Sequence, residues 1–96
     1  MNKCYISGPI TGTTDYVERF NFAAEQVKRL YPDFQIINPV ELCINLPVET
    51  SWKEYMDVCL KALNECTHIM MMDGWEFSKG ATVEYYIARD KGLFFL

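Results

Sequence analysis

Short apolar stretches alternate with helix-like stretches along the chain, and this alternation restricts the fold more than any other feature. Residues 3–7, 34–37, 67–72 and 93–96 each have the length and composition of a single strand. They lack the regular polar position of a half-exposed strand, so they are typical of strands buried on both faces of a parallel sheet. Because helix-like segments lie between them, the predicted element order is βαβαβαβ.

Two segments carry both a helix start signal and an apolar stripe. Asp15 followed by Glu18, and Ser51 followed by Glu54, match the capping box, in which two side chains bond free backbone N–H groups. Apolar residues then recur at helical spacing in both segments. They are Val17, Phe20, Ala24, Val27 and Leu30 in the first segment, and Trp52, Tyr55, Met56, Cys59, Leu60 and Leu63 in the second.

A third helix is expected from about Gly80 to Asp90, because Gly92 is a typical helix stop. Residues 38–50, in contrast, show no periodicity and contain two prolines. We expect this segment to be irregular, and irregular segments of this length in a small domain are typical of binding loops or lids.

These elements predict a single α/β domain over residues 1–96, since half of the residues are apolar and can form one core. Right-handed crossovers around a central first strand give a doubly wound, flavodoxin- or Rossmann-like parallel sheet in the order 2-1-3-4, with helices on both faces. Ligands of such sheets bind beyond the carboxyl ends of the strands, where the chain reverses direction. Residues 7–9 and 73–75 lie there.

Composition argues against several kinds of function. The net charge of −4 disfavours a nucleic-acid polymer as partner, because a phosphate backbone needs clustered Lys and Arg, although a single nucleotide remains compatible. The four cysteines form no CxxC pair and the only histidine, His68, reads as a core residue, so we expect no metal site. Without a signal or bilayer-spanning stretch, we expect a cytoplasmic protein with reduced thiols, three of them buried.

Two strand ends could contribute to a site, and each has an ordinary structural alternative. In the loop after residue 7, Gly8 and Gly12 would let backbone N–H groups approach an anion or a sugar, but a plain strand-to-helix turn explains them equally. After the third strand, Asp73 could accept hydrogen bonds from a base and Trp75 could stack on a ring. An Asp-Gly turn beside a partly buried indole is the alternative.

The start of the third helix could contribute a carboxylate. Glu84 lies near the helix N-terminus, where the helix dipole favours its ionised form, and its helix neighbours Ala81 and Ala88 leave room for a ligand. A solvated surface glutamate is the alternative, and Ser78 is equally consistent with a plain helix N-cap. The local sequence leaves these alternatives open.

Together these elements resemble the nucleoside 2-deoxyribosyltransferase family. Residues 5–9 (YISGP) resemble its opening strand motif, and residues 78–84 (SKGATVE) are similar to its Asp-Pro-Gly-Thr-x-x-Glu segment. With Asn38-Pro39, the Trp52 helix and residues 74–76 (GWE), the chain is most similar to a short branch of this family that is common in bacteriophage and bacterial genomes.

The resemblance implies cleavage or transfer at the N-glycosidic bond of deoxyribonucleosides or their 5′-monophosphates, without a cofactor. Glu84 would attack C1′ and form a covalent glycosyl–enzyme intermediate, Tyr5 would orient Glu84, and Asp73 would hold or protonate the departing base. The spacing from Asp73 to Glu84 is shorter here than in the family. The substrate-binding residues expected on this basis are Ser7, Gly8, Pro9, Ile10, Gly12, Asn38, Trp75, Ser78 and Gly80.

Ser78 distinguishes two activities within this resemblance. Transferases of the family have an aspartate at this position, whereas the related deoxynucleoside 5′-monophosphate N-glycosidases use a serine there to bind the phosphate. We therefore expect a monophosphate substrate and hydrolysis rather than base exchange.

Two other functions are alternatives to this enzyme. A non-catalytic nucleotide-binding module of the same fold is the main alternative, but a pure binder has little use for an ionised Glu84 facing a sugar. A flavodoxin-like electron carrier fits poorly, because the first loop lacks a Ser/Thr-rich phosphate cradle. We also expect a homodimer through a helix face, since so small a sheet buries limited area and the chain has 14 aromatic residues.

Overall fold

All four predicted strands form, and they make one parallel sheet in the order β2-β1-β3-β4. A computed structural model describes residues 1–96, with the strands β1 (Lys3–Ser7), β2 (Gln35–Ile37), β3 (His68–Met71) and β4 (Phe94–Phe95). β1 is central: its Cys4 pairs with a residue of β2 and with a residue of β3. The predicted α/β fold class and strand order are confirmed.

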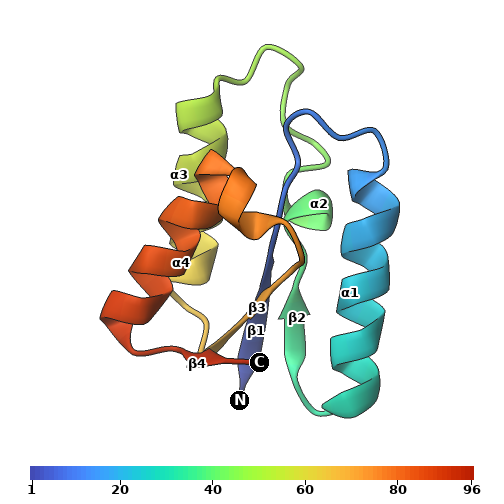
Figure 1. Cartoon of the computed structure of the whole chain (residues 1–96), viewed down its shortest axis with the longest axis vertical. Helices are drawn as coiled ribbons and strands as arrows, with labels where there is room; N and C mark the ends of the chain where they lie inside the picture. The colour runs from blue at the N-terminus through green and yellow to red at the C-terminus, as the bar shows by residue number, and fades with distance from the viewer.

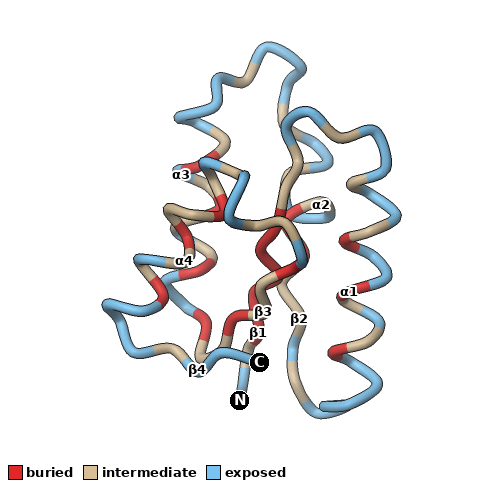
Figure 2. Tube along the Cα trace, viewed as in Figure 1, coloured by how far each residue is buried: buried red, intermediate tan, exposed pale blue.

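Helices cover both faces of this sheet. In Figure 1, α1 (Tyr16–Leu30) stands on one side of the sheet, and α3 (Trp52–Leu63) and α4 (Lys79–Lys91) stand on the other. Successive side chains of β1 point to opposite faces of the sheet, so neighbouring residues pack against different helices. Ile6 packs with α1, whereas Tyr5 packs with α3 and α4. Figure 2 shows the buried residues along the sheet and on the helix sides that face it.

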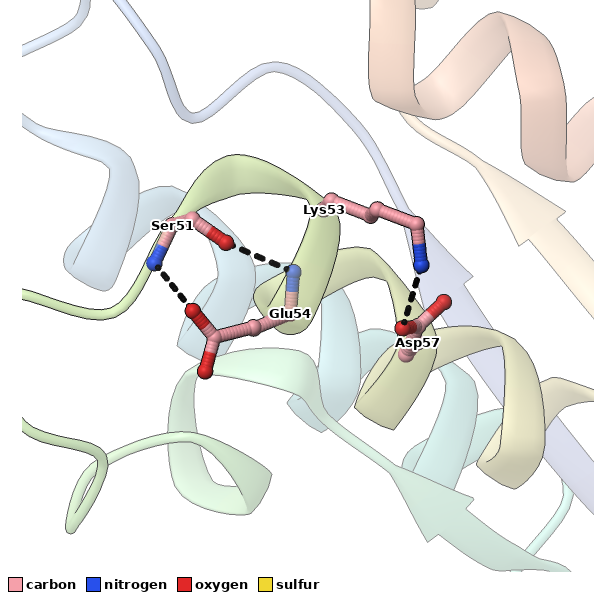
Figure 3. A network of polar contacts seen from close by, with 4 residues as sticks. All are labelled: Ser51, Lys53, Glu54 and Asp57. Carbon is pink, nitrogen blue, oxygen red and sulfur yellow. Dashed lines mark hydrogen bonds and ion pairs between the residues drawn. The ribbon is translucent and has the colours of Figure 1, made fainter.

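The capping box predicted for α3 is confirmed. Ser51 Oγ accepts a hydrogen bond from the Glu54 backbone N–H at 3.1 Å, and Glu54 Oε1 accepts one from the Ser51 N–H at 3.3 Å (Figure 3). An exposed ion pair between Lys53 and Asp57 follows one turn later on the same helix. Because exposed pairs of this kind stabilise a helix only weakly, the cap is the stronger local determinant of where α3 begins.

The capping box predicted for α1 is wrong, and its apolar stripe is only partly correct. Asp15 occupies the N-cap position but makes no side-chain cap, because its backbone (φ −113°, ψ 19°) is not in the extended conformation that directs the side chain to the free N–H groups. Phe20 and Val27 are buried as expected, whereas Leu30 is exposed. The helix is longer than the three-residue strand beside it, so its ends extend beyond the sheet.

Residues 38–50 contain a short helix, which corrects the prediction of an irregular segment. In α2 (Pro39–Leu42), the Asn38 side chain accepts a hydrogen bond from the Val40 N–H at 3.0 Å, and Pro39 occupies the first turn. Asparagine followed by proline is a helix start signal that was available in the sequence. A second unpredicted turn, the 3₁₀ helix η1 (Trp75–Phe77), connects β3 to α4.

The ends of α4 agree with the sequence. Ser78 is its N-cap and accepts a hydrogen bond from the Ala81 N–H at 3.2 Å. Gly92 ends the helix with a φ of 75°, in the left-handed region that favours glycine.

The four cysteines are free thiols, and three of them are buried as predicted: Cys4, Cys59 and Cys66, with Cys43 half-buried. Burial raises the pKa of Cys4 and Cys59 to about 12 and that of Cys66 to about 11. These three thiols are therefore protonated and weakly nucleophilic at neutral pH. None of the helices combines the length and the apolar composition that a bilayer crossing requires.

The two helix starts give a matched test of capping. We expect Ser51→Ala to lower the free energy of unfolding by about 1 kcal/mol, because it removes a cap that is present. Asp15→Ala should have a smaller effect, because no side-chain hydrogen bond is lost. Urea denaturation followed by circular dichroism measures both, and a larger loss for Asp15→Ala than for Ser51→Ala would contradict this account.

Candidate active site

A cleft of about 810 Å³ opens at the carboxyl end of β1, where the sheet topology predicts a ligand site. Its walls come from the loop after β1, the segment between α2 and α3, the first turns of α3, and the start of α4. These segments lie at the same end of the sheet in Figure 1. The lining residues are Tyr5, Gly8, Ile10, Thr11, Phe20, Pro39, Cys43, Leu46, Pro47, Val48, Thr50, Ser51, Trp52, Tyr55, Met56, Phe77, Ser78, Lys79, Gly80, Ala81 and Glu84.

Glu84 is the only carboxylate that lines this cleft, and it is 5% exposed. Tyr5 Oη donates a hydrogen bond to Glu84 Oε2 at 2.5 Å, and Ser7 Oγ donates one to Oε1 at 2.7 Å. The carboxylate is thus held by two donors from the central strand. Such burial rules out the solvated surface glutamate that the local sequence left open.

The helix and the strand both contribute to this placement. Tyr5 and Ser7 are two residues apart on β1, so their side chains point to the same face of the sheet. On α4, the helix neighbours of Glu84 are Ala81 and Ala88, which are both buried. Their small side chains let α4 approach the sheet closely, and the carboxylate then reaches the two hydroxyl groups.

Burial also sets the charge of the carboxylate. Desolvation raises the pKa of Glu84 from 4.5 to about 7, although the hydrogen bonds from Ser7 and Tyr5 lower it. The cleft holds one basic side chain, Lys79, whose Nζ lies 4.4 Å from the centroid of the Trp52 ring. Glu84 therefore exists in both protonation states near neutral pH, as is typical of carboxyl groups that transfer protons or act as nucleophiles.

Thiol and phenol groups lie beside this carboxylate, and they were not predicted from the sequence. Cys59 is buried in the same core cluster as Tyr5, and its Sγ lies 3.9 Å from that of Cys43. Tyr55 lines the cleft beside them. Burial raises the pKa of both Tyr5 and Tyr55, so both phenols remain donors. In the sequence, Tyr55 and Cys59 belong to an apolar helix stripe and read simply as core residues.

The cleft brings together six of the predicted site residues: Tyr5, Gly8, Ile10, Ser78, Gly80 and Glu84. Gly8 is required by close packing, because a Cβ there would lie 2.8 Å from Met72 Sδ. Ser7 is buried directly behind the carboxylate rather than in the cleft wall. The loop after β1, which was expected to line the ligand site, therefore does so only in part.

Other predicted residues do not line the cleft. The Asn38 side chain caps α2 and donates to Asn21 Oδ1 at 2.9 Å, so its polar groups are already bonded. Trp75 stacks on the ring of Tyr85 with the centroids 4.4 Å apart. Pro9 packs near Gly74, and Gly12 has the positive φ of a turn with open space around it.

Asp73 also lies outside the cleft. It lines a second groove beside α1, and its backbone carbonyl accepts a hydrogen bond from Arg19 at 3.3 Å. This geometry does not support a contact between Asp73 and a ligand bound at Glu84. His68 lies at the opposite end of β3, between the rings of Phe34 and Phe94, which fits the structural role expected for it. No group of three or more His, Cys, Asp or Glu side chains lies close enough to hold a metal ion.

The raised pKa of Glu84 predicts a pH-dependent stability. Between about pH 4.5 and pH 7 the folded state holds a proton on Glu84 that the unfolded state has lost, so raising the pH favours unfolding. The stabilisation is complete below about pH 4.5 and is lost as the pH rises through about 7, and the total change is on the order of 3 kcal/mol.

Glu84→Gln isolates this effect, because glutamine keeps the shape of the protonated side chain but does not titrate. We expect the free energy of unfolding of the variant to exceed that of the wild type increasingly as the pH rises from about 5 to about 8. Urea titrations of both proteins at several pH values measure the difference between their free energies of unfolding. All other titrating groups contribute equally to both proteins and cancel in this difference. Parallel stability curves would show that the pKa of Glu84 is not raised.

Residues 2–95 match a protein family described as a domain of unknown function (DUF4406). The matched region contains all four strands and every residue that lines the cleft. No curated protein matches the chain. Because the match extends over almost the whole sequence, the chain belongs to the DUF4406 family.

Proposed function

We propose that this protein cleaves the N-glycosidic bond of deoxyribonucleoside 5′-monophosphates by hydrolysis, with Glu84 as the nucleophile. The observation that carries the proposal is the buried Glu84 carboxylate in a ligand-sized cleft, held by hydrogen bonds from Tyr5 and Ser7. The resemblance to nucleoside 2-deoxyribosyltransferases supports the same residue from the sequence. Both arguments point to Glu84 independently.

The chemistry needs a fixed carboxylate close to the sugar. As the bond from C1′ to the base nitrogen breaks, positive charge develops on the sugar, and an ionised Glu84 stabilises it before bonding to C1′. The bonding electrons leave with the base nitrogen, which takes up a proton. Water then attacks C1′, the bond from C1′ to the Glu84 oxygen breaks, and the water proton is lost to solvent, which balances the proton that the base took up. The carboxylate is regenerated and the sugar phosphate is released.

Tyr5 and Ser7 have a defined role in this scheme. Each donates to a different oxygen of Glu84, so the plane of the carboxylate is fixed, and each oxygen retains a lone pair for attack on C1′. Both hydrogen bonds also favour the ionised form that the reaction requires. Asp73 lines a different groove, and we assign it no part in protonating the base.

The rest of the cleft suits a nucleotide. Its volume of about 810 Å³ lies within the range of small-ligand pockets. Trp52, Tyr55 and Phe77 provide aromatic surface for a base. Ser78 and Lys79 stand at the N-terminus of α4, where a hydroxyl donor, an ammonium group and the helix dipole favour a phosphate. Although Ser78 Oγ accepts from the Ala81 N–H, its own hydrogen remains free to donate.

The test is chromatography of free base released from a panel of deoxynucleosides and their 5′-monophosphates. We expect the wild type to cleave monophosphates, and Glu84→Gln to lose the activity by roughly three orders of magnitude or more. Glu76→Gln is the matched control, because it makes the same change at an exposed carboxylate in η1. It should retain activity.

Three outcomes would contradict parts of the proposal. Full activity of Glu84→Gln would exclude it as the nucleophile. Equal cleavage of free nucleosides would remove the role given to Ser78 in phosphate recognition. If no substrate released base, yet nucleotides raised the melting temperature of wild type and variant alike, the protein would instead be a non-catalytic nucleotide-binding module.

A further inference from the structure

The two faces of the sheet are covered unequally. Two long helices, α3 and α4, cover one face, whereas α1 is the only long helix on the other (Figure 1). The core on the α1 side contains residues of β1 and α1 together with Met72 just after β3, and Met70 is only partly buried against it. Over β3 and β4 this face has no helix. A parallel sheet is normally buried on both faces, so this half of the face lacks a packing partner.

Apolar side chains are exposed on this face. Phe94 of β4 is paired in register with His68 of β3, which is paired with Cys4 of the α1-side core, so all three point to this face. Phe94 is 67% exposed, and Phe22, on the side of α1 that borders β3, is 63% exposed. Large exposed rings of this kind, gathered on one face, mark an interaction surface.

A groove of about 530 Å³ lies between α1 and the carboxyl end of β3. Phe22 forms one wall, and Met70 of β3 and Met72 just after it form the other, with charged groups at the rim. The lining residues are Glu18, Arg19, Phe22, Ala23, Gln26, Met70, Met71, Met72 and Asp73. We refer to these nine residues together with Phe94 as the α1 face.

The α1 face is self-complementary in shape and charge. A protruding ring, Phe22, stands beside a methionine-lined hollow. The cationic Arg19 and the anionic Glu18 and Asp73 line the same groove, and Arg19 donates to the Asp73 backbone carbonyl rather than to a carboxylate. In an interface with two-fold symmetry the same surface meets itself. If the axis passes between these features, the ring of one copy meets the hollow of the other, and the cation meets the anion. A strongly charged partner would not be selected, because both signs are present at the rim. The chemistry therefore fits a second copy of this chain.

We propose that the protein forms a two-fold symmetric homodimer through the α1 face, with Phe22 of each copy entering the groove of the other and Arg19 pairing with Asp73 across the interface. This surface includes the sheet face and differs from the purely helical interface expected from the sequence. The proposal assigns Asp73 to association rather than to the cleft. It does not depend on the proposed enzymatic activity.

Sedimentation equilibrium of the full chain from micromolar to millimolar concentration tests the proposal. We expect the wild type to dimerise, and Phe22→Asp to raise the dissociation constant at least roughly tenfold. Leu30→Asp is the matched control, because it makes a similar change at an exposed apolar residue of the same helix outside the groove. Circular dichroism of each variant verifies that the fold is retained.

A charge exchange gives a second, independent test. Arg19→Glu and Asp73→Arg should each weaken the dimer, since each places like charges opposite one another. Mixing the two variants should restore dimers, because the heterodimer regains two pairs of opposite charge. A monomeric wild type at millimolar concentration, an unaffected Phe22→Asp, an equally weakened Leu30→Asp, or a mixture that stays monomeric would each overturn the proposal.

Discussion

The hydrogen bonds from Tyr5 and Ser7 to Glu84 determine how α4 and β1 are arranged, and the rest of the site depends on them. A carboxyl group buried this deeply must be hydrogen-bonded, because leaving it without partners would destabilise the fold. These two hydrogen bonds join residues that are 79 and 77 positions apart in the sequence. They therefore hold the start of α4 beside the carboxyl end of the central strand, and the cleft lies where these two elements meet.

The turn between β3 and α4 connects two surfaces of the molecule. Asp73, at its beginning, lines the groove beside α1, whereas Phe77 and Ser78, at its end, line the cleft. Gly74, with a φ of 85°, allows the chain to change direction between them. Because so few residues separate the two surfaces, packing on one of them restrains the backbone of the other.

The fold was largely predictable from the sequence, and the site only in part. The strand order follows from the apolar segments and from the right-handed crossovers between them, and both can be predicted from short stretches of sequence. The small neighbours of Glu84 on its helix left open whether its carboxylate faces a ligand or solvent, and only the family resemblance singled this residue out. The position of Asp73 was not predictable, because it depends on the backbone path through η1, and the groups of Tyr55 and Cys59 near the carboxylate depend on how α3 rotates against the sheet.

The buried Glu84 also has an evolutionary consequence. The ionised form that the proposed chemistry requires is the form that the folded protein disfavours, since burial raises the pKa of Glu84 to about 7. A neutral residue of the same shape would relieve this conflict and make the protein more stable, while removing the proposed nucleophile. If the proposed chemistry were no longer selected, mutation would therefore lead readily to stable descendants without this carboxylate, and a glutamate retained at this position in a relative would argue for continuing selection on the proposed chemistry.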